Sequence, residues 1–173
     1  YEYPADACFA RATALAPDVA RWPYYRGLHA LLRDPDRAVP FLQRAADLQS
    51  PTSTPSAPIH MRLAEAYLER GRLDEAEAVF RRILDGGSSD PRASYGLALI
   101  ALSRGDTRAA AAYLGPALES PFTRKKATAR RAALARLLGD TADAERTERT
   151  ALALPDDLPW VDPFVTDYTD LQV

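Results

Sequence analysis

The stretch LAEAYLERGRLDEAEAVFRRIL, residues 63–84, decides the fold of this chain. Before Gly71, apolar residues recur at the three- and four-residue spacing of one helix face: Leu63, Ala64 and Tyr67. A second such set follows the glycine: Ala76, Phe80 and Ile83. Apolar residues at this spacing predict amphipathic helices, and a glycine between two such patterns predicts a tight turn. The stretch therefore predicts two helices that form an antiparallel hairpin.

The hairpin pattern recurs along the chain at a fixed interval. Glycines follow one another every 34 residues, at Gly71, Gly105 and Gly139. Packing alanines keep the same interval, at Ala76, Ala110 and Ala144. A period of this length is the signature of helix–turn–helix repeats, which bury a continuous core only by stacking on one another.

On these residues the chain resembles the tetratricopeptide repeat (TPR) family. The best-matched unit carries five motif residues: Leu63, Ala64, Tyr67, Ala76 and Phe80. Pro91 follows this unit and closes it. The resemblance implies an all-α fold, an α-solenoid of antiparallel helix hairpins wound into a right-handed superhelix. It also implies that the first helices of the repeats line a concave groove.

The repeat register divides the chain into segments of a single solenoid domain. We expect the second helix of a truncated repeat at 1–17, TPR-like repeats at 18–50, 58–90 and 91–120, a linker at 51–57, a degenerate terminal repeat at 121–154 and an acidic aromatic tail at 155–173. The expected helices span about 4–16, 20–32, 36–48, 58–70, 74–85, 91–104, 107–119, 122–138 and 141–153. Because the chain begins with Tyr1 inside a helix pattern, we expect it to be a trimmed fragment, in which a signal peptide would be invisible.

Composition and charge exclude several kinds of partner and site for this chain. A net charge of −2 gives no overall drive toward nucleic acid or membrane, and no apolar run has the length of a membrane span. The lone Cys8 excludes an internal disulfide framework and multi-cysteine metal sites, and we expect it to be a small buried side chain.

Candidates for catalysis are few. The two histidines, His29 and His60, fall in different repeats and in no metal-binding spacing, so we expect both to be ordinary helix residues. The run from Gly86 to Ser89 lacks the lysine of a phosphate loop and predicts a turn. Asp106 and Asp140 precede helices, where capping explains them. We therefore predict no catalytic residue, no metal and no cofactor, and a chain that is not an enzyme.

Two charged segments lie near the carboxyl end. The first predicted helix of the last repeat carries six cations with no acid between them: Arg124, Lys125, Lys126, Arg130, Arg131 and Arg136. They form either a solvated helix face, which the acidic tail could neutralise, or an anion-binding strip. The tail holds five aspartates and no cation in 156–173. Its aromatic residues are atypical of disorder, so we expect part of it, including Trp160 and Phe164, to pack on the last helix pair.

By the register of the resemblance, one set of side chains would line the groove: Arg62, Glu65, Leu68, Arg92, Tyr95, Leu99, Lys126 and Arg130. This implies a protein–protein interaction module with a scaffold or adaptor role, which binds a peptide or protein segment that is acidic and carries an apolar anchor. The carboxylate clamp of chaperone-binding relatives uses asparagine, which this chain lacks entirely. The alternatives are a structural or regulatory segment that contacts a neighbouring domain of its own chain, and an anion or nucleic-acid binder that uses the strip at 124–136. The net charge disfavours nucleic acid.

Overall fold

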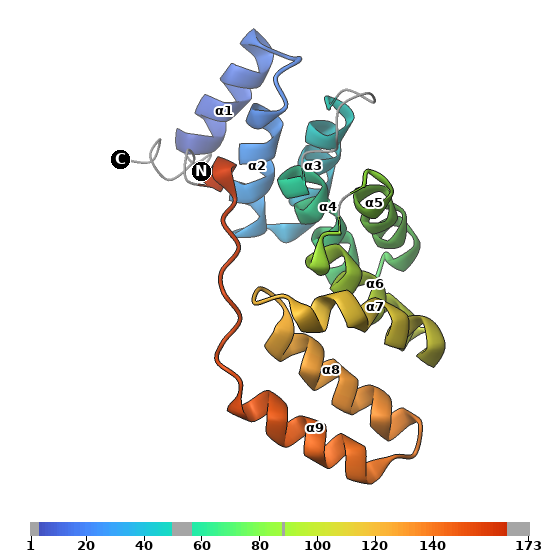
Figure 1. Ribbon diagram of the computed structural model, residues 1–173. Helices are drawn as coiled ribbons and strands as arrows, with labels where there is room; N and C mark the ends of the chain where they lie inside the picture. The colour runs from blue at the N-terminus through green and yellow to red at the C-terminus, as the bar shows by residue number, and fades with distance from the viewer. Residues whose placement is uncertain (1–3, 50–56, 88, 166–173) are drawn as a thin grey trace. The chain divides into compact units, whose positions relative to one another are not determined.

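The computed structural model describes residues 4–49, 57–87 and 89–165, and the regular secondary structure of these residues is helical, with no strand among them (Figure 1). The helices in chain order are α1 (Pro4–Leu15), α2 (Arg21–Leu31), the 3-10 helix η1 (Pro35–Arg37), α3 (Ala38–Asp47), α4 (Ala57–Glu69), α5 (Leu73–Asp85), α6 (Pro91–Ser103), α7 (Thr107–Glu119), α8 (Arg124–Leu137) and α9 (Thr141–Ala153). The predicted all-α fold and helix order are confirmed. Most of the predicted linker at 51–57 lies outside the described residues, since α4 begins at Ala57.

The turns within the hairpins follow from their glycines. Gly71, Gly105 and Gly139 have φ angles of 68°, 75° and 81°. Only glycine adopts this left-handed region at little cost, so each of the three glycines ends one helix and reverses the chain. Where the chain offers Asp34-Pro35-Asp36 in place of a glycine, η1 makes the connection between α2 and α3.

The chain divides into two compact units, and the boundary falls inside α5. Unit 1 comprises the residues up to Val79 together with the segment that begins at Val161. Within it, α1 packs on α2, α2 on α3 and α3 on α4. Phe9 of α1 lies against Tyr25 of α2, with ring centroids 5.4 Å apart, and the Tyr67 hydroxyl of α4 donates to the Gln43 side chain of α3 over 2.7 Å.

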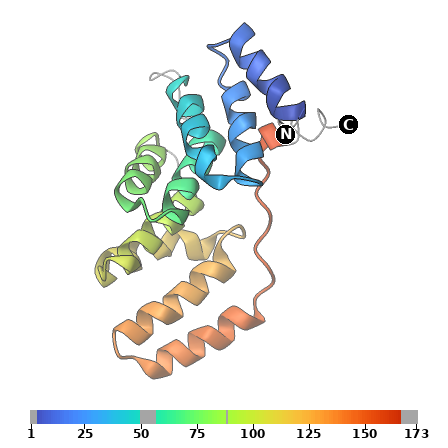
Figure 2. The ribbon, with the colours of Figure 1, turned by 180° about the vertical axis from the view of Figure 1, so that it is seen from behind.

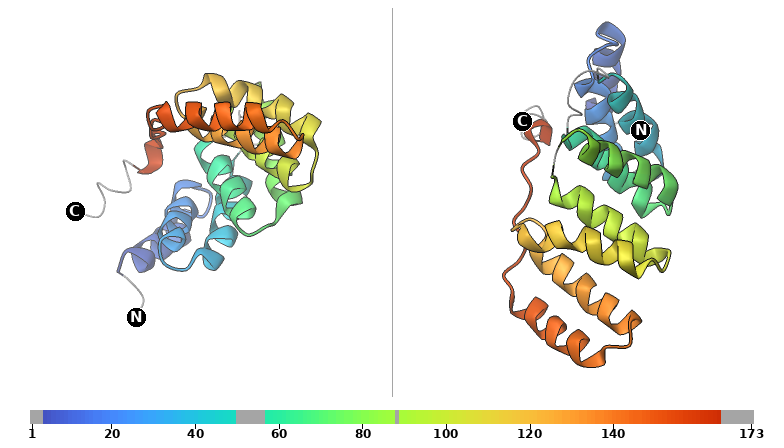
Figure 3. Two further views of the ribbon diagram at one scale, coloured as in Figure 1. Left: turned by 90° about the horizontal axis from the view of Figure 1, so that it is seen from below. Right: turned by 45° about the vertical axis from the view of Figure 1, so that its right-hand side comes forward.

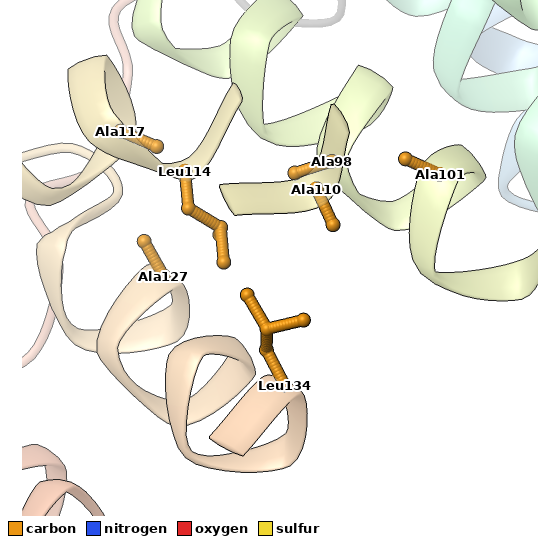
Figure 4. Packing of buried hydrophobic residues seen from close by; sticks show 7 residues of the cluster. All are labelled: Ala98, Ala101, Ala110, Leu114, Ala117, Ala127 and Leu134. Atoms are coloured by element: carbon orange, nitrogen blue, oxygen red, sulfur yellow. The ribbon is translucent and has the colours of Figure 1, made fainter. Parts of the chain in front are cut away.

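Unit 2 runs from Phe80 to Trp160. Here α6 packs on α7, α7 on α8 and α8 on α9, with α8 and α9 antiparallel (Figure 3). Small and branched side chains from α6, α7 and α8 form the core: Ala98, Ala101, Ala110, Leu114, Ala117, Ala127 and Leu134. Figure 4 shows Leu114 directed toward Leu134 in the space that the alanines leave. Alanine at most of these positions lets the helix backbones approach closely, while the leucines fill the remaining volume.

Two predictions about individual segments are wrong. Cys8 is exposed, because α1 buries Phe9 and turns the neighbouring side chain to solvent. After α9 the chain continues in an extended conformation up to Asp162 (Figure 2), and the two aromatic rings among the described residues of this segment lie against helices other than the last pair. Trp160 contacts Arg92 of α6, and Phe164 contacts Tyr24 of α2. Asp156 and Asp157 form hydrogen bonds with α8, and Leu158 forms one with the loop before it.

Candidate functional site

Unit 2 brings three of the predicted groove residues together around one aromatic ring. The ammonium of Lys126 lies 5.2 Å from the ring centroid of Tyr95, and Arg130 Nε donates to the Tyr95 hydroxyl over 3.4 Å. Lys126 and Arg130 are one turn apart on α8, and Tyr95 faces them from α6. Both cations are exposed, so this cluster presents positive charge beside a ring. Cations held near an aromatic face favour ligands that combine carboxylates with an apolar group.

Arg92, one turn before Tyr95 on α6, does not present a free charge. Its guanidinium is paired with Asp90 through Nε–Oδ1 and Nη2–Oδ2 distances of 3.1 and 2.6 Å. Its Cζ lies 3.5 Å from the ring centroid of Trp160, which comes from the segment after α9. A two-point carboxylate contact fixes the plane of the guanidinium, so that Arg92 offers a flat surface for an aromatic ring.

The segment after α9 also supplies an anion to the start of α8. The Asp157 carboxylate accepts from the backbone N–H groups of Lys125 and Lys126, over 2.7 and 3.2 Å. The N-cap residue Thr123 makes no capping bond, because its hydroxyl donates to the carbonyl of Ala117 instead. Free N–H groups at a helix start favour negative charge, so Asp157 stabilises this end of the helix from a distant part of the chain.

Two further contacts hold the same segment. The Asp156 carboxylate accepts from Lys125 Nζ over 2.7 Å, and this hydrogen bond holds the pKa of Asp156 below its usual value. The Leu158 N–H donates to the Pro121 carbonyl over 2.9 Å. Residues 156–160 are therefore bound to α8 by carboxylates, to the loop before α8 by one backbone hydrogen bond, and to α6 by a stacked indole.

Most of the six cations of the strip at 124–136 have specific partners. Arg124 donates to the carbonyls of Leu118 and Glu119, and Arg136 pairs with Glu148 of α9. Lys125 pairs with Asp156, while Lys126 and Arg130 meet at Tyr95. The charges consequently point in several directions and do not form one continuous anion-binding face.

The remaining predicted groove residues lie on α4 in unit 1, except Leu99, which is half-buried one turn after Tyr95 on α6. On α4, Arg62, Glu65 and Leu68 share one helix face and are half-buried. Arg62 Nη1 donates to Glu65 Oε2 over 3.4 Å, and its Nε lies 3.9 Å from Asp162 Oδ2. Asp162 belongs to the segment of unit 1 that follows Trp160.

Asp162 is the most deeply buried carboxylate contact of unit 1. Its side chain is 2% exposed, and its Oδ2 accepts from the Tyr24 hydroxyl of α2 over 2.5 Å. Its other oxygen accepts from the Phe164 N–H over 3.0 Å, which closes a tight turn, and the Phe164 ring meets the Tyr24 ring edge to face at 5.3 Å. Burial, together with the adjacent carboxylate, raises the pKa of Tyr24 well above its usual value. Tyr24 therefore remains a hydroxyl donor at any physiological pH.

The sequence did not predict the roles of Asp157 and Asp162, and Tyr24 was not among the predicted groove residues. The pattern of an aspartate two residues before an aromatic ring, as in Asp162-Pro163-Phe164, was a local signal for the turn. Its partner on α2 lies 138 residues away in the sequence, and no helix periodicity reports a contact at that distance.

The described residues offer no group of His, Cys, Asp and Glu that could hold a metal ion. Among the helices of the described ranges, none has the length and apolar character needed to cross a membrane. His29 and His60 are both buried within their helices.

Comparison with known proteins gives one family match and several similar solved structures. Residues 29–101 match the family described as tetratricopeptide repeat. No curated protein matches the chain. The structure of MamA is similar, with 17% identity and a TM-score of 0.72, and the match covers 85% of this chain and 84% of MamA. PilW, a widely conserved type IV pilus biogenesis factor, has 21% identity and a TM-score of 0.64, and the match covers 92% of this chain and 71% of PilW. YrrB, a TPR protein with an unusual peptide-binding site, has 19% identity and a TM-score of 0.55, and the match covers 95% of this chain and 92% of YrrB. At these identities the likeness concerns the fold.

Proposed function

We propose that this chain is a protein-binding module, with a scaffold or adaptor role, that holds an extended acidic segment with an aromatic anchor on the first helices of its repeats. The proposal starts from the match of residues 29–101 to the tetratricopeptide repeat family. The repeat register selects the side chains proposed for partner contact in each unit by itself. In unit 2 they are Arg92, Tyr95, Leu99, Lys126 and Arg130, and in unit 1 they are Arg62, Glu65 and Leu68. YrrB, which shares the fold, is described as having a peptide-binding site, and this is compatible with the proposal.

One observation carries the proposal: the chain's own segment 156–160 lies on α6 and α8 in the manner of a bound peptide. Its two aspartates are held at the start of α8, and its tryptophan stacks on Arg92. A surface that holds this segment offers the same contacts to a partner of similar chemistry, namely carboxylates followed by an indole. The exposed cations of the Tyr95 cluster lie on the same two helices and would attract such a segment through charge.

The observations favour this function over the alternatives. Nucleic-acid binding needs a continuous basic surface that follows phosphates, whereas the cations of 124–136 are divided among carbonyls, carboxylates and a ring. A neighbouring domain of the same chain would use the same surface, and it is a special case of the proposal in which the acidic segment is covalently attached.

The test uses a synthetic peptide of residues 155–165 in which Asp162 and Phe164 are replaced with Ser and Ala, so that only its acidic and tryptophan half is native. The full chain carries Asp157→Ala and Trp160→Ala to weaken its own occupant. We expect Lys126→Glu with Arg130→Glu to weaken peptide binding about tenfold, because each reversal replaces an attraction with a repulsion. Fluorescence polarisation measures the affinity, and added salt should weaken it further.

The matched control is Arg81→Glu with Arg82→Glu, which makes the same charge change on the exposed face of α5. We expect this pair to retain the affinity within about twofold, since distant exposed charges are largely screened. If both double variants lose the same affinity, then net charge alone explains the binding and the proposed surface is wrong.

A further inference from the structure

We infer that unit 1 contains a second recognition site, formed by Tyr24 of α2 and Arg62 of α4, which binds a partner segment with the pattern aspartate, any residue, aromatic residue in a tight turn, and which the chain's own Asp162-Pro163-Phe164 occupies. The inference rests on the proposed function only in that it assigns a peptide ligand to the same class of helices. Its residues differ from those of the α6–α8 surface, so the two can fail separately.

The geometry of the occupant defines the ligand. Asp162 contributes both carboxylate oxygens, one to the Tyr24 hydroxyl and one to its own Phe164 N–H. The second bond fixes the aromatic ring two residues after the carboxylate, where it meets the Tyr24 ring at 5.3 Å. Tyr24 therefore contacts two features of the ligand: its hydroxyl donates to the acid, and its ring packs against the aromatic residue. A segment without the acid would leave the Tyr24 hydroxyl without an acceptor. A segment without the aromatic residue would leave the Tyr24 ring uncovered.

The polar groups of the site and of its occupant are buried together while the turn is in place. Tyr24 is 0% and Asp162 4% exposed. A tyrosine hydroxyl buried at this depth needs an acceptor, since an unsatisfied buried donor is costly. Without the 162–164 turn, the Tyr24 hydroxyl would be left without its acceptor.

The occupant also fits the site imperfectly. Arg62 Nε is shielded from solvent and has no hydrogen-bond partner among the described residues, and its distance to Asp162 Oδ2 is 3.9 Å. A charge-assisted hydrogen bond would be about 1 Å shorter. A partner whose backbone is free to approach α4 could satisfy Tyr24 and Arg62 together. The chain's own turn then acts as a tethered competitor, which a better-fitting partner segment displaces.

The experiment uses the full chain and a peptide of residues 155–165 in which Asp156 and Asp157 are replaced with Ser and Trp160 with Ala, so that only the 162–164 turn is native. Binding is measured to the wild-type chain and to a chain that carries Asp162→Ser and Phe164→Ala. We expect the variant chain to bind the peptide at least about tenfold more tightly, because a tethered competitor reaches a millimolar effective concentration. Should that variant melt early, Asp162→Asn alone provides the weakened occupant with its shape kept.

In the variant chain, Tyr24→Phe should weaken peptide binding about tenfold, since it removes a hydrogen bond to a buried charge. Tyr67→Phe is the matched control, because it removes a hydroxyl of the same unit that bonds Gln43 and not the turn. Lys126→Glu with Arg130→Glu should leave this affinity unchanged, which separates the site from the α6–α8 surface.

Three outcomes would overturn the inference. Equal binding to wild-type and Asp162→Ser/Phe164→Ala chains would show that the turn does not compete for the site. Equal losses from Tyr24→Phe and Tyr67→Phe would show a general effect of stability. A wild-type dimer that the peptide dissociates, as seen by sedimentation, would assign the site to the turn of a second copy and not to a different partner.

Discussion

Contacts of single small residues determine how closely the helices of unit 2 approach. Gly96 of α6 lies against the ring of Phe80, which is 1% exposed and belongs to the second half of α5. A Cβ at Gly96 would lie 2.3 Å from Phe80 Cζ, far inside van der Waals contact. The chain therefore needs glycine at this position for space, whereas the glycines of the turns are needed for their φ angles.

Gly96→Ala should lower the free energy of unfolding by about 1–3 kcal/mol, because the ring must shift within a packed core. In a chain that already carries Phe80→Leu, Gly96→Ala should cost less stability than it does in the wild-type chain. A double-mutant cycle measured by urea unfolding gives this difference. Gly115→Ala on α7 is the control, since a Cβ there meets nothing within 4 Å. We expect the control to change stability by no more than about 0.5 kcal/mol, as its gain in helix propensity is opposed by crowding from Pro116. An equal loss at both glycines would exclude the ring contact as the cause.

The packing alanines were predictable from the sequence, and the contacts of the polar residues were not. Ala76, Ala110 and Ala144 recur at one interval and are at most 1% exposed. The interval reports burial because a repeat places the same position in the same environment each time. Arg92 was predicted to line the groove, but its guanidinium is paired with Asp90, and the helix periodicity does not predict which acid pairs with an arginine.

Some helices are capped by the residue that directly precedes them, and α8 is capped by a residue far along the chain. The carboxylate of Asp106 accepts from the Ala109 N–H at the start of α7, and the carboxylate of Asp140 accepts from the Asp143 N–H at the start of α9, each over 2.9 Å. Both caps were predicted, since an acid before a helix is a local signal. The acid at the start of α8 comes from Asp157, beyond α9, and could not be predicted from the residues around α8.

Asp106→Ala should lower the free energy of unfolding by about 0.5–2 kcal/mol, the usual loss for an N-cap whose carboxylate is removed. Asp106→Asn keeps an acceptor oxygen and should retain most of the stability, so the pair separates capping from the charge of the side chain. Urea midpoints of the two variants give the comparison. If Asn loses as much as Ala, the charge near the helix start accounts for the effect and the hydrogen bond does not.

For the whole molecule, the sequence was sufficient where the fold is periodic. The order and approximate bounds of the helices follow from the repeat, and so does the set of side chains on the first helices. The course of the segment after α9 does not, because it belongs to no repeat and its contacts join residues such as Asp162 and Tyr24 that lie far apart in the chain. The candidate sites depend on this segment. The repeat register singles out side chains on α4, α6 and α8, but it does not single out Tyr24 or the segment that occupies the sites.

All titrating groups contribute to the pH dependence of stability, and we expect His29 and Asp6 to act in two separate pH ranges. The pKa of His29 is lowered, first by burial and then by the nearby charge of Arg33. The unfolded chain then binds a proton more readily than the folded chain, so stability is lost as pH falls below about 6.5. The pKa of Asp6 is lowered, mainly by its hydrogen bond from Arg26. Its contribution is present above about pH 4 and is lost as pH falls through the lower folded value.

Urea unfolding at intervals from pH 8 to pH 3 should therefore show two declines. His29→Gln should flatten the upper decline and leave the lower one, because glutamine does not titrate. Asp6→Asn should reduce the lower decline and leave the upper one nearly intact, although it also removes the attraction that Asp6 exerts on a protonated His29. Other carboxylates titrate in the lower window as well, so only the upper decline should vanish with a single substitution. A His29→Gln chain that still loses stability between pH 7 and pH 5 would show that a group other than His29 controls the upper window.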